Sequence, residues 1–332
     1  MKLLILTNNP SRASFRLRIE DHLDYLGQQG IDSDVYAMPR GIVERWRLFR
    51  RFGQYDAVLV HRKCFNFWDA AILSRTCPKT IKMIFDFDDA IMHSTSRPES
   101  RRTSHYRLFR RTAKRMDAMI AGNEYLAGYA RRYCNRVFVL PTGLDATACP
   151  AQSVEKSPDE IRLVWIGSES TLKYLAELRP VLEEIGKTHK NVILRIIADK
   201  FFDLENMPVE KCPWSLTSQV ADLQACDIGL SPLPENRFTQ GKCGFKMLQY
   251  FAAGLPVIAS PVGVNETFIN ESHAGFLAST PAEWKNAIEK MVNDIAAYRL
   301  LGENGRKYVQ AYDKTVIAKE LCRILKSVMV QS

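Results

Sequence analysis

The stretch from Asp227 to Gly263 constrains the fold more than any other part of the chain. It begins with a short apolar run, Asp227 to Ser231, which ends at prolines and predicts a buried strand followed by a loop. A helical pattern comes next, and Gly254 and Pro256 are placed to end that helix. Leu255 to Ala259 then predicts a second buried strand. Strand, helix and strand in this order are typical of a parallel α/β sheet.

Two lysines stand at the predicted start of this helix, where Gly241 and Gly244 relieve the backbone. Lys242 and Lys246 are four residues apart, which predicts that they share a helix face. The first turn of a helix already carries partial positive charge, so cations there are unfavourable unless an anion is bound. The pattern therefore predicts a diphosphate cradle. The alternative interpretation is a pair of solvated lysines.

The residues Gly-Lys-Cys-Gly-Phe-Lys-Met-Leu-Gln-Tyr-Phe-Ala-Ala-Gly-Leu-Pro-Val-Ile-Ala-Ser-Pro-Val-Gly, 241–263, resemble the donor-site signature of glycosyltransferase family 4. Enzymes of that family use nucleotide sugars and have the GT-B fold. The resemblance implies an α/β protein with two Rossmann-like domains, whose parallel sheets face each other across a cleft. It also implies a C-terminal helix that crosses back to the first domain.

The rest of the chain agrees with two such domains. Apolar strand-like runs alternate with helical patterns from Lys2 to Leu140, and a second alternating series begins at Ile161. The segment between the two series is polar and contains proline, as linkers do. The expected parts are an acceptor domain at 1–145, a linker at 146–160, a donor domain at 161–312 and a returning helix at 313–332.

In the donor domain, Gly167 and Ser168 form a small-residue turn between a predicted strand and a helix, an arrangement that binds anions. The resemblance places this turn at the donor diphosphate, with Lys173 as an assisting cation. The sequence has neither a G-x-G-x-x-G motif nor a Walker A motif, so NAD-binding and P-loop functions lack their signatures. Trp214, in a loop, is a candidate to stack on the nucleotide base, and the alternative is a packing role.

Family members carry two glutamates eight positions apart at the donor site, and the second binds the ribose. The matching positions here are Gly241 and Gln249. Gln249 retains the ability to hydrogen-bond a ribose hydroxyl, but without charge. Gly241 cannot replace its glutamate, and Glu235 is a nearby candidate for that role.

The acceptor side is assigned to polar residues that follow strand ends in the first domain. These residues are Arg16, Asp86, Asp88, Asp89 and His93, with Arg18 and His61 as neighbours in the pattern. Three carboxylates so close together repel one another unless they meet cations or hydroxyls. A metal site of the Asp-x-Asp kind belongs to a different transferase fold, and GT-B enzymes as a class need no bound divalent cation. We therefore expect no metal and no cofactor beyond the nucleotide sugar.

Basic residues are concentrated in the first domain. The net charge is +9, and between Arg40 and Arg136 there are 21 Lys and Arg against 9 Asp and Glu. Arginines alternate with aromatics in 45–52 and 101–115, a pattern that suits an anionic membrane surface. Nucleic acid and a merely solvated basic face are the alternatives. The apolar runs are too short to span a bilayer, and eight scattered cysteines without C-x-x-C spacing indicate a cytosolic protein.

The sequence thus predicts a retaining, metal-independent transferase at the cytosolic face of a membrane. It would move a sugar from a nucleotide sugar to a saccharide or lipid-linked acceptor, with Lys242 and Lys246 as catalytic residues that stabilise the leaving diphosphate. Two alternatives remain open: a UDP-sugar epimerase of the same fold, and a non-catalytic basic protein that binds membranes or nucleic acid.

Overall fold

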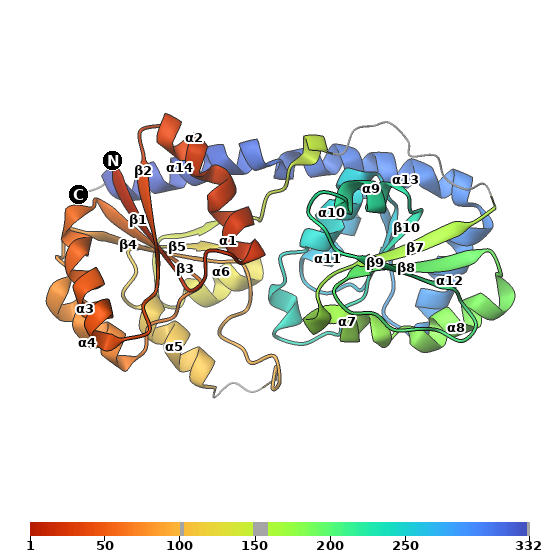
Figure 1. Ribbon diagram of the computed structural model, residues 1–332, viewed down its shortest axis with the longest axis horizontal. Helices are drawn as coiled ribbons and strands as arrows, with labels where there is room; N and C mark the ends of the chain where they lie inside the picture. The colour runs from red at the N-terminus through yellow and green to blue at the C-terminus, as the bar shows by residue number, and fades with distance from the viewer. Residues whose placement is uncertain (100–102, 149–158, 331–332) are drawn as a thin grey trace. The chain divides into compact units, whose positions relative to one another are not determined.

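The computed structural model describes residues 1–99, 103–148 and 159–330, and it divides the chain into two compact units (Figure 1). Unit 1 contains the residues up to Gly143, residues 236–243 and the residues from Lys314 on. Unit 2 contains Leu144–Glu235 and Gly244–Asp313. Each unit has a six-stranded parallel sheet, which confirms the predicted α/β class. Residues 149–158 of the predicted linker lie outside the described residues.

The sheet of unit 1 has the strand order β2-β1-β3-β4-β5-β6. Its strands are β1 (Lys2–Thr7), β2 (Asp32–Ala37), β3 (Ala57–His61), β4 (Lys82–Phe87), β5 (Ala118–Ala121) and β6 (Val137–Val139). The central strands read as continuous apolar runs because helices cover both faces of the sheet.

Helices cover the two faces of this sheet with two separate cores. Side chains of α3, α4, α5 and α6 pack on one face, and side chains of α1, α2 and α14 pack on the other (Figure 1). Their bounds are α1 (Ala13–Arg18), α2 (Leu23–Gln28), α3 (Ile42–Arg50), α4 (Phe67–Thr76), α5 (Ser104–Ala113), α6 (Glu124–Ala130) and α14 (Lys314–Val330). The last helix buries an apolar stripe that includes Ile317, Leu321 and Leu325 in the core of unit 1.

Residues 236–243 belong to unit 1, although they lie in the middle of the sequence of unit 2. The Tyr125 hydroxyl donates to the carbonyl of Arg237 at 3.0 Å, and the Asn123 amide donates to the carbonyl of Lys242 at 3.1 Å. A Cβ on Gly241 would lie only 2.7 Å from the Cβ of Ala90. The close approach of Ala90 therefore explains the glycine at this position.

The sheet of unit 2 has the strand order β12-β11-β10-β7-β8-β9. Its strands are β7 (Ile161–Ile166), β8 (Val192–Ala198), β9 (Val209–Pro213), β10 (Ile228–Ser231), β11 (Val257–Ala259) and β12 (Gly275–Leu277). The edge strand β9 was not predicted, because its sequence is polar and contains only one long apolar side chain.

The helices of unit 2 also form two layers. One core contains side chains of α7, α8 and α12, and the other contains side chains of α9, α10 and α11. The bounds are α7 (Glu169–Ala176), α8 (Arg179–Thr188), α9 (Gln219–Gln224), α10 (Phe245–Ala253), α11 (Val264–Ser272), α12 (Pro281–Asn293) and α13 (Ile295–Tyr308). Helix α10 ends as predicted at Gly254, which has a left-handed φ of +74°.

Candidate active site

The start of α10 differs from the sequence-based prediction. Gly244 is the N-cap and has a φ of +66°, so the helix begins at Phe245. Lys242 precedes it in extended conformation, with φ −68° and ψ 143°. The prediction that Lys242 and Lys246 share a helix face is therefore wrong: the left-handed backbone at Gly244 separates them. Lys246 alone stands in the first turn, at a helix end that has no side-chain cap.

Lys246 lies at the carboxyl end of β7, beside the turn that leads into α7. Its ammonium is 4.2 Å from the centroid of the Trp165 ring and donates to the Thr171 hydroxyl at 3.2 Å. A Cβ on Gly167 would lie 2.5 Å from that ammonium and 2.5 Å from the Trp165 ring. Gly167 therefore leaves the space in which the lysine is held. The arrangement places a cation next to the starts of two helices. The first amide of α7, that of Glu169, already donates to the Asp199 carboxylate at 2.8 Å, whereas the N-cap of α10 is a glycine without a side-chain cap. A cation at the start of α10 is favourable for binding a phosphate.

Tyr250 fixes the position of α10 against the sheet. Its hydroxyl donates to the carbonyl of Leu230 at 3.0 Å and accepts from the amide of Ile166 at 3.1 Å. Burial raises the pKa of this tyrosine, so it stays neutral. A Cβ on Gly229 would clash with the ring at 2.7 Å, which explains the glycine in β10. Because Tyr250 is held to two strands, the helix that carries Lys246 and Gln249 is held too.

Two donor-side candidates, Trp214 and Gln249, both contact Gln219, a residue that was not predicted from the sequence. The Gln219 side-chain oxygen accepts from the Trp214 indole N–H at 3.2 Å and from the Gln249 amide at 3.1 Å. Trp214 keeps 44% of its surface exposed, so it is not a core tryptophan. Gln249 is three residues from Lys246 on the same helix, and the two therefore lie on the same side of α10. The sequence gives no signal for Gln219, because its partner Gln249 is 30 residues away and only the folded chain brings the two together.

Two further donor-side candidates, Ser168 and Lys173, contact residues one or two positions away in the sequence. Ser168 is the exposed N-cap of α7, and its hydroxyl lies 2.9 Å from that of Ser170. Lys173 lies in the last turn of α7, and its ammonium is 5.2 Å from the centroid of the neighbouring Tyr174 ring. Ser168 is thus at the same turn as Gly167, whereas Lys173 is at the far end of the helix.

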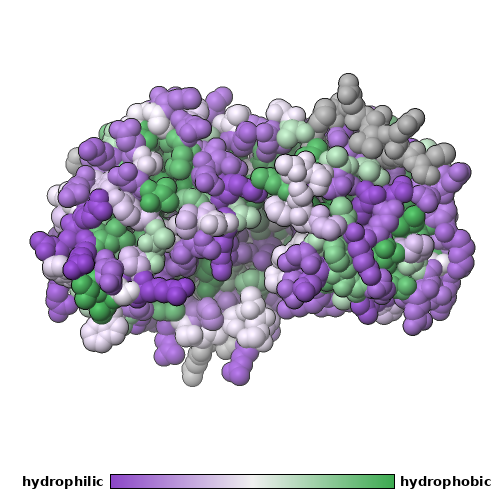
Figure 2. Space-filling model, viewed as in Figure 1, coloured by the Kyte–Doolittle hydropathy of each residue, from purple (hydrophilic) through white to green (hydrophobic). Residues whose placement is uncertain are grey.

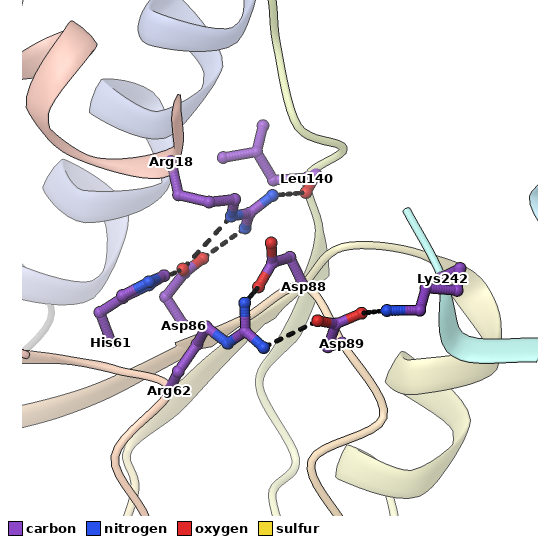
Figure 3. A network of polar contacts seen from close by, with 8 residues as sticks. All are labelled: Arg18, His61, Arg62, Asp86, Asp88, Asp89, Leu140 and Lys242. Atoms are coloured by element: carbon purple, nitrogen blue, oxygen red, sulfur yellow. Dashed lines mark hydrogen bonds and ion pairs between the residues drawn. The ribbon is translucent and has the colours of Figure 1, made fainter. Parts of the chain in front are cut away.

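In unit 1, the three predicted carboxylates lie at or after the end of β4, and each one meets a cation (Figure 3). Asp86 is fully buried and pairs with Arg18 through both carboxylate oxygens. Arg18 also donates to the carbonyl of Leu140 at 2.6 Å, and the His61 Nδ1 atom lies 2.9 Å from Asp86. Burial alone would raise the pKa of Asp86, but Arg18 and His61 lower it to about 2.

The other two carboxylates share Arg62, which follows β3 directly. Its guanidinium lies 2.7 Å from Asp89 and 3.2 Å from Asp88, and Lys242 donates to Asp89 at 3.0 Å (Figure 3). Burial raises the pKa of Asp88, Arg62 opposes that shift and Asp89 adds to it. Arg62 has a left-handed φ of +54°, which is strained for a residue with a side chain. The strain is tolerated where the residue links two carboxylates.

The remaining acceptor-side candidates lie apart from this network. Arg16 is half-buried in α1, and the arginine of that helix that reaches a carboxylate is Arg18. His93 is buried with its ring 5.2 Å from that of Tyr129, in an edge-on contact. Burial lowers the pKa of His93, and the positive charge of Arg237 adds to this effect. Both effects favour the neutral form of the histidine.

Among the described residues, no group of three or more His, Cys, Asp or Glu side chains is arranged to hold a metal ion. Within residues 1–99, 103–148 and 159–330, no helix combines the length and the apolar content that a bilayer crossing requires.

Comparisons with known proteins agree with this architecture. Residues 143–294 match the family model described as "Glycosyl transferases group 1". No curated protein sequence matches the chain. Among solved structures, sucrose-phosphate synthase from Thermosynechococcus elongatus is similar with a TM-score of 0.77 at 14% identity, over 100% of both chains.

Two further solved structures have the same architecture. HepE from Anabaena, in complex with UDP, has a TM-score of 0.70 at 15% identity and covers 98% of this chain and 100% of its own. A glycosyltransferase from Rickettsia africae has a TM-score of 0.73 at 12% identity, over 100% of this chain and 99% of its own. Part of the chain, residues 143–294, thus matches a glycosyltransferase family model, and the likeness of the whole chain to these solved structures shows the GT-B fold.

Proposed function

We propose that the protein transfers a hexose from a nucleoside-diphosphate sugar to a saccharide or a lipid-linked acceptor. The proposal includes retention of the anomeric configuration, independence of a bound metal and a role in cell-surface polysaccharide or glycolipid synthesis. It also places the enzyme at the cytosolic face of a membrane. The family match to glycosyltransferases supports the coarse part of this statement.

The single observation that carries the proposal is the setting of Lys246. The lysine is held between the Trp165 ring and the Thr171 hydroxyl, at the uncapped start of α10 and beside Gly167. When the bond between sugar and diphosphate breaks, negative charge develops on the diphosphate. A fixed ammonium and the partial positive charge at the start of α10 stabilise that charge without needing to reorganise. This is the role that a metal ion fills in other transferases.

The nucleotide is proposed to bind next to it, at Trp214 and Gln249. Trp214 offers an exposed aromatic face for the base, and Gln249 offers an amide for the ribose hydroxyls. The similar structure of HepE contains UDP, so a UDP-sugar is the first donor to test.

On the acceptor side, we propose Asp88 and Asp89 as hydrogen-bond acceptors for sugar hydroxyls. Both carboxylates are already oriented by Arg62, which fixes their positions before an acceptor arrives. Lys242 is a second, weaker candidate for charge stabilisation, because its ammonium is also paired with Asp89.

The test is a thermal-shift panel of UDP-, GDP- and dTDP-sugars on the parent protein and on Lys246→Ala. A donor at 100 times its dissociation constant adds about 2.7 kcal/mol to the free energy of unfolding of the parent. We expect one nucleotide class to stabilise the parent and the Lys246→Ala variant to lose most of that gain. Equal stabilisation of both proteins would overturn the assignment of Lys246.

Product analysis separates this function from its main alternative. Incubation with the stabilising donor should release sugar onto an added acceptor, and NMR of the product anomer reports retention or inversion. Conversion of the UDP-sugar to its epimer without any acceptor would instead identify an epimerase.

A further inference from the structure

Five large apolar side chains are exposed together on two neighbouring helices of unit 1. They are Ile42 (51% exposed), Val43 (52%) and Trp46 (40%) in α3, and Phe67 (63%) and Trp68 (61%) in the first turn of α4. We call this group the aromatic corner. No other pair of packed helices in the described part of the chain exposes as many large apolar side chains. Isolated exposed apolar residues are ordinary, but a cluster of this kind marks an interaction surface.

The aromatic corner rests on a rigid base. Arg45 of α3 pairs at 2.9 Å with the buried carboxylate of Asp69, which closes the capping box at the start of α4. Arg45 also donates to the carbonyl of Pro39 at 2.7 Å. The starts of the two helices, and therefore their apolar residues, are held next to each other.

Positive charge surrounds these apolar residues. From Arg40 to Arg51 there are five arginines and only one acid, Glu44. Arg50 lies over the Trp46 ring at 4.7 Å from its centroid, so the aromatic and basic side chains are interleaved. Helix α5 packs on the same face of the sheet as α3 and α4, and it adds the exposed basic residues Arg107 and Arg110. Figure 2 shows green and pale residues beside purple ones over the corner that α3 and α4 occupy in Figure 1.

We propose that the aromatic corner docks unit 1 on an anionic lipid surface, and this rests on the proposed function at a membrane. Tryptophan and phenylalanine side chains enter the boundary between headgroups and acyl chains, while the surrounding arginines bind the anionic headgroups. A second copy of the chain is a poor partner for this surface. In a two-fold interface the arginines of one copy would face those of the other, with Glu44 as the only acid on α3.

The test is flotation of the full-length protein with two kinds of vesicle. One kind is phosphatidylcholine alone, and in the other about a third of the lipid is phosphatidylglycerol. We expect the parent to bind the anionic vesicles and to bind neutral ones at least tenfold more weakly. The triple variant Trp46→Ser, Phe67→Ser, Trp68→Ser should bind anionic vesicles roughly tenfold more weakly. The double variant Arg47→Gln, Arg50→Gln should bind anionic vesicles about fivefold more weakly for each arginine removed, or roughly twenty-five-fold more weakly in total.

Control variants lie on unit 2. Leu300→Ser removes an equally exposed apolar side chain, and Lys187→Gln with Lys307→Gln removes two exposed charges. These controls should bind anionic vesicles as the parent does. If the control variants lose as much binding to anionic vesicles as the corner variants do, the proposal is overturned. Such a result would show that binding does not depend on the aromatic corner.

The outcome is separable from that of the proposed function. Thermal shift with the UDP-sugar is measured on every variant and also checks that each one folds. A parent that binds the sugar nucleotide but neither vesicle overturns the docking surface and leaves the donor site intact. A parent that binds anionic vesicles through the corner without binding any sugar nucleotide leaves the surface intact and refutes the transferase assignment. Corner-dependent dimers in light scattering, without vesicle binding, would show that the surface serves protein contacts instead.

Discussion

The two units have the same parallel architecture, but the carboxyl ends of their strands carry different chemistry. In unit 1 the charged groups there pair with one another: Asp86 with Arg18, and Asp88 and Asp89 with Arg62 and Lys242. In unit 2 the corresponding edge presents the ammonium of Lys246 at the uncapped start of α10. The topology therefore fixes where polar groups gather, and the side chains decide whether that edge is internally paired or prepared for an anion.

The largest expected effect tests the paired edge of unit 1. Asp86→Asn keeps the shape of the side chain but leaves the buried guanidinium of Arg18 without its counter-charge. We expect the free energy of unfolding to fall by about 3–5 kcal/mol, as measured by urea denaturation. The control is Glu124→Gln, which removes an exposed pair with Arg131 and should cost at most about 1 kcal/mol. A loss for Asp86→Asn no larger than that of the control would show that the pair is not structural.

The next effect tests the cationic edge of unit 2. Lys246→Ala removes a fixed charge from the proposed diphosphate site, and kcat/KM should fall about a hundredfold. Lys242→Ala should cost less, because part of its charge is already used by Asp89. The steady-state rates of both variants are compared with that of Lys187→Ala, an exposed lysine elsewhere on unit 2. A larger loss in Lys242→Ala than in Lys246→Ala would reverse the proposed roles.

The pH dependence of stability tests the lowered pKa of Asp86. Its pKa in the folded protein is about 2, below the ordinary value of 3.8, so its pairing stabilises the fold above about pH 4. This contribution, about 2 kcal/mol, is lost as the pH falls toward 2. The difference in urea midpoint between the parent and Asp86→Asn should therefore shrink on acidification. A difference that stays constant down to about pH 2 contradicts the depressed pKa.

A smaller effect tests the space around Lys246. Gly167→Ala adds a Cβ that would lie 2.5 Å from the ammonium and from the Trp165 ring. Displacement of the lysine should raise the KM for the donor about tenfold, while a far-UV circular dichroism spectrum stays unchanged. Gly128→Ala is the matched control, because nothing lies within 4 Å of its added Cβ. An unchanged KM in Gly167→Ala would mean that the lysine has other space to occupy.

The smallest expected effect concerns Gln219, which orients Trp214 and Gln249 without being assigned a contact to the donor. Gln219→Ala removes two hydrogen bonds, and we expect the KM for the donor to rise about fivefold with kcat unchanged. Gln219→Glu keeps the acceptor oxygen and should recover part of the loss. If the KM for the donor is as high in Gln219→Glu as in Gln219→Ala, the two hydrogen bonds do not position Trp214 and Gln249.

Sequence reasoning identified what depends on local patterns. The strand–helix–strand order, the helix end at Gly254 and the two-sheet class were predicted from apolar runs and glycines. The separation of Lys242 from Lys246 was missed, because spacing alone does not show that Gly244 adopts a left-handed backbone. The partners of Asp86 were missed for a different reason. Arg18 is 68 residues away, and only the folded sheet brings the two together.

The division of the chain has a consequence for synthesis. Unit 1 begins with the first residue, yet it also needs residues 236–243 and the residues from Lys314 on. As the nascent chain leaves the ribosome, the first sheet is made early, but the apolar groove that receives Ile317, Leu321 and Leu325 stays uncovered until the last helix is translated. A fragment that stops at Gly143 should therefore aggregate when it is expressed alone.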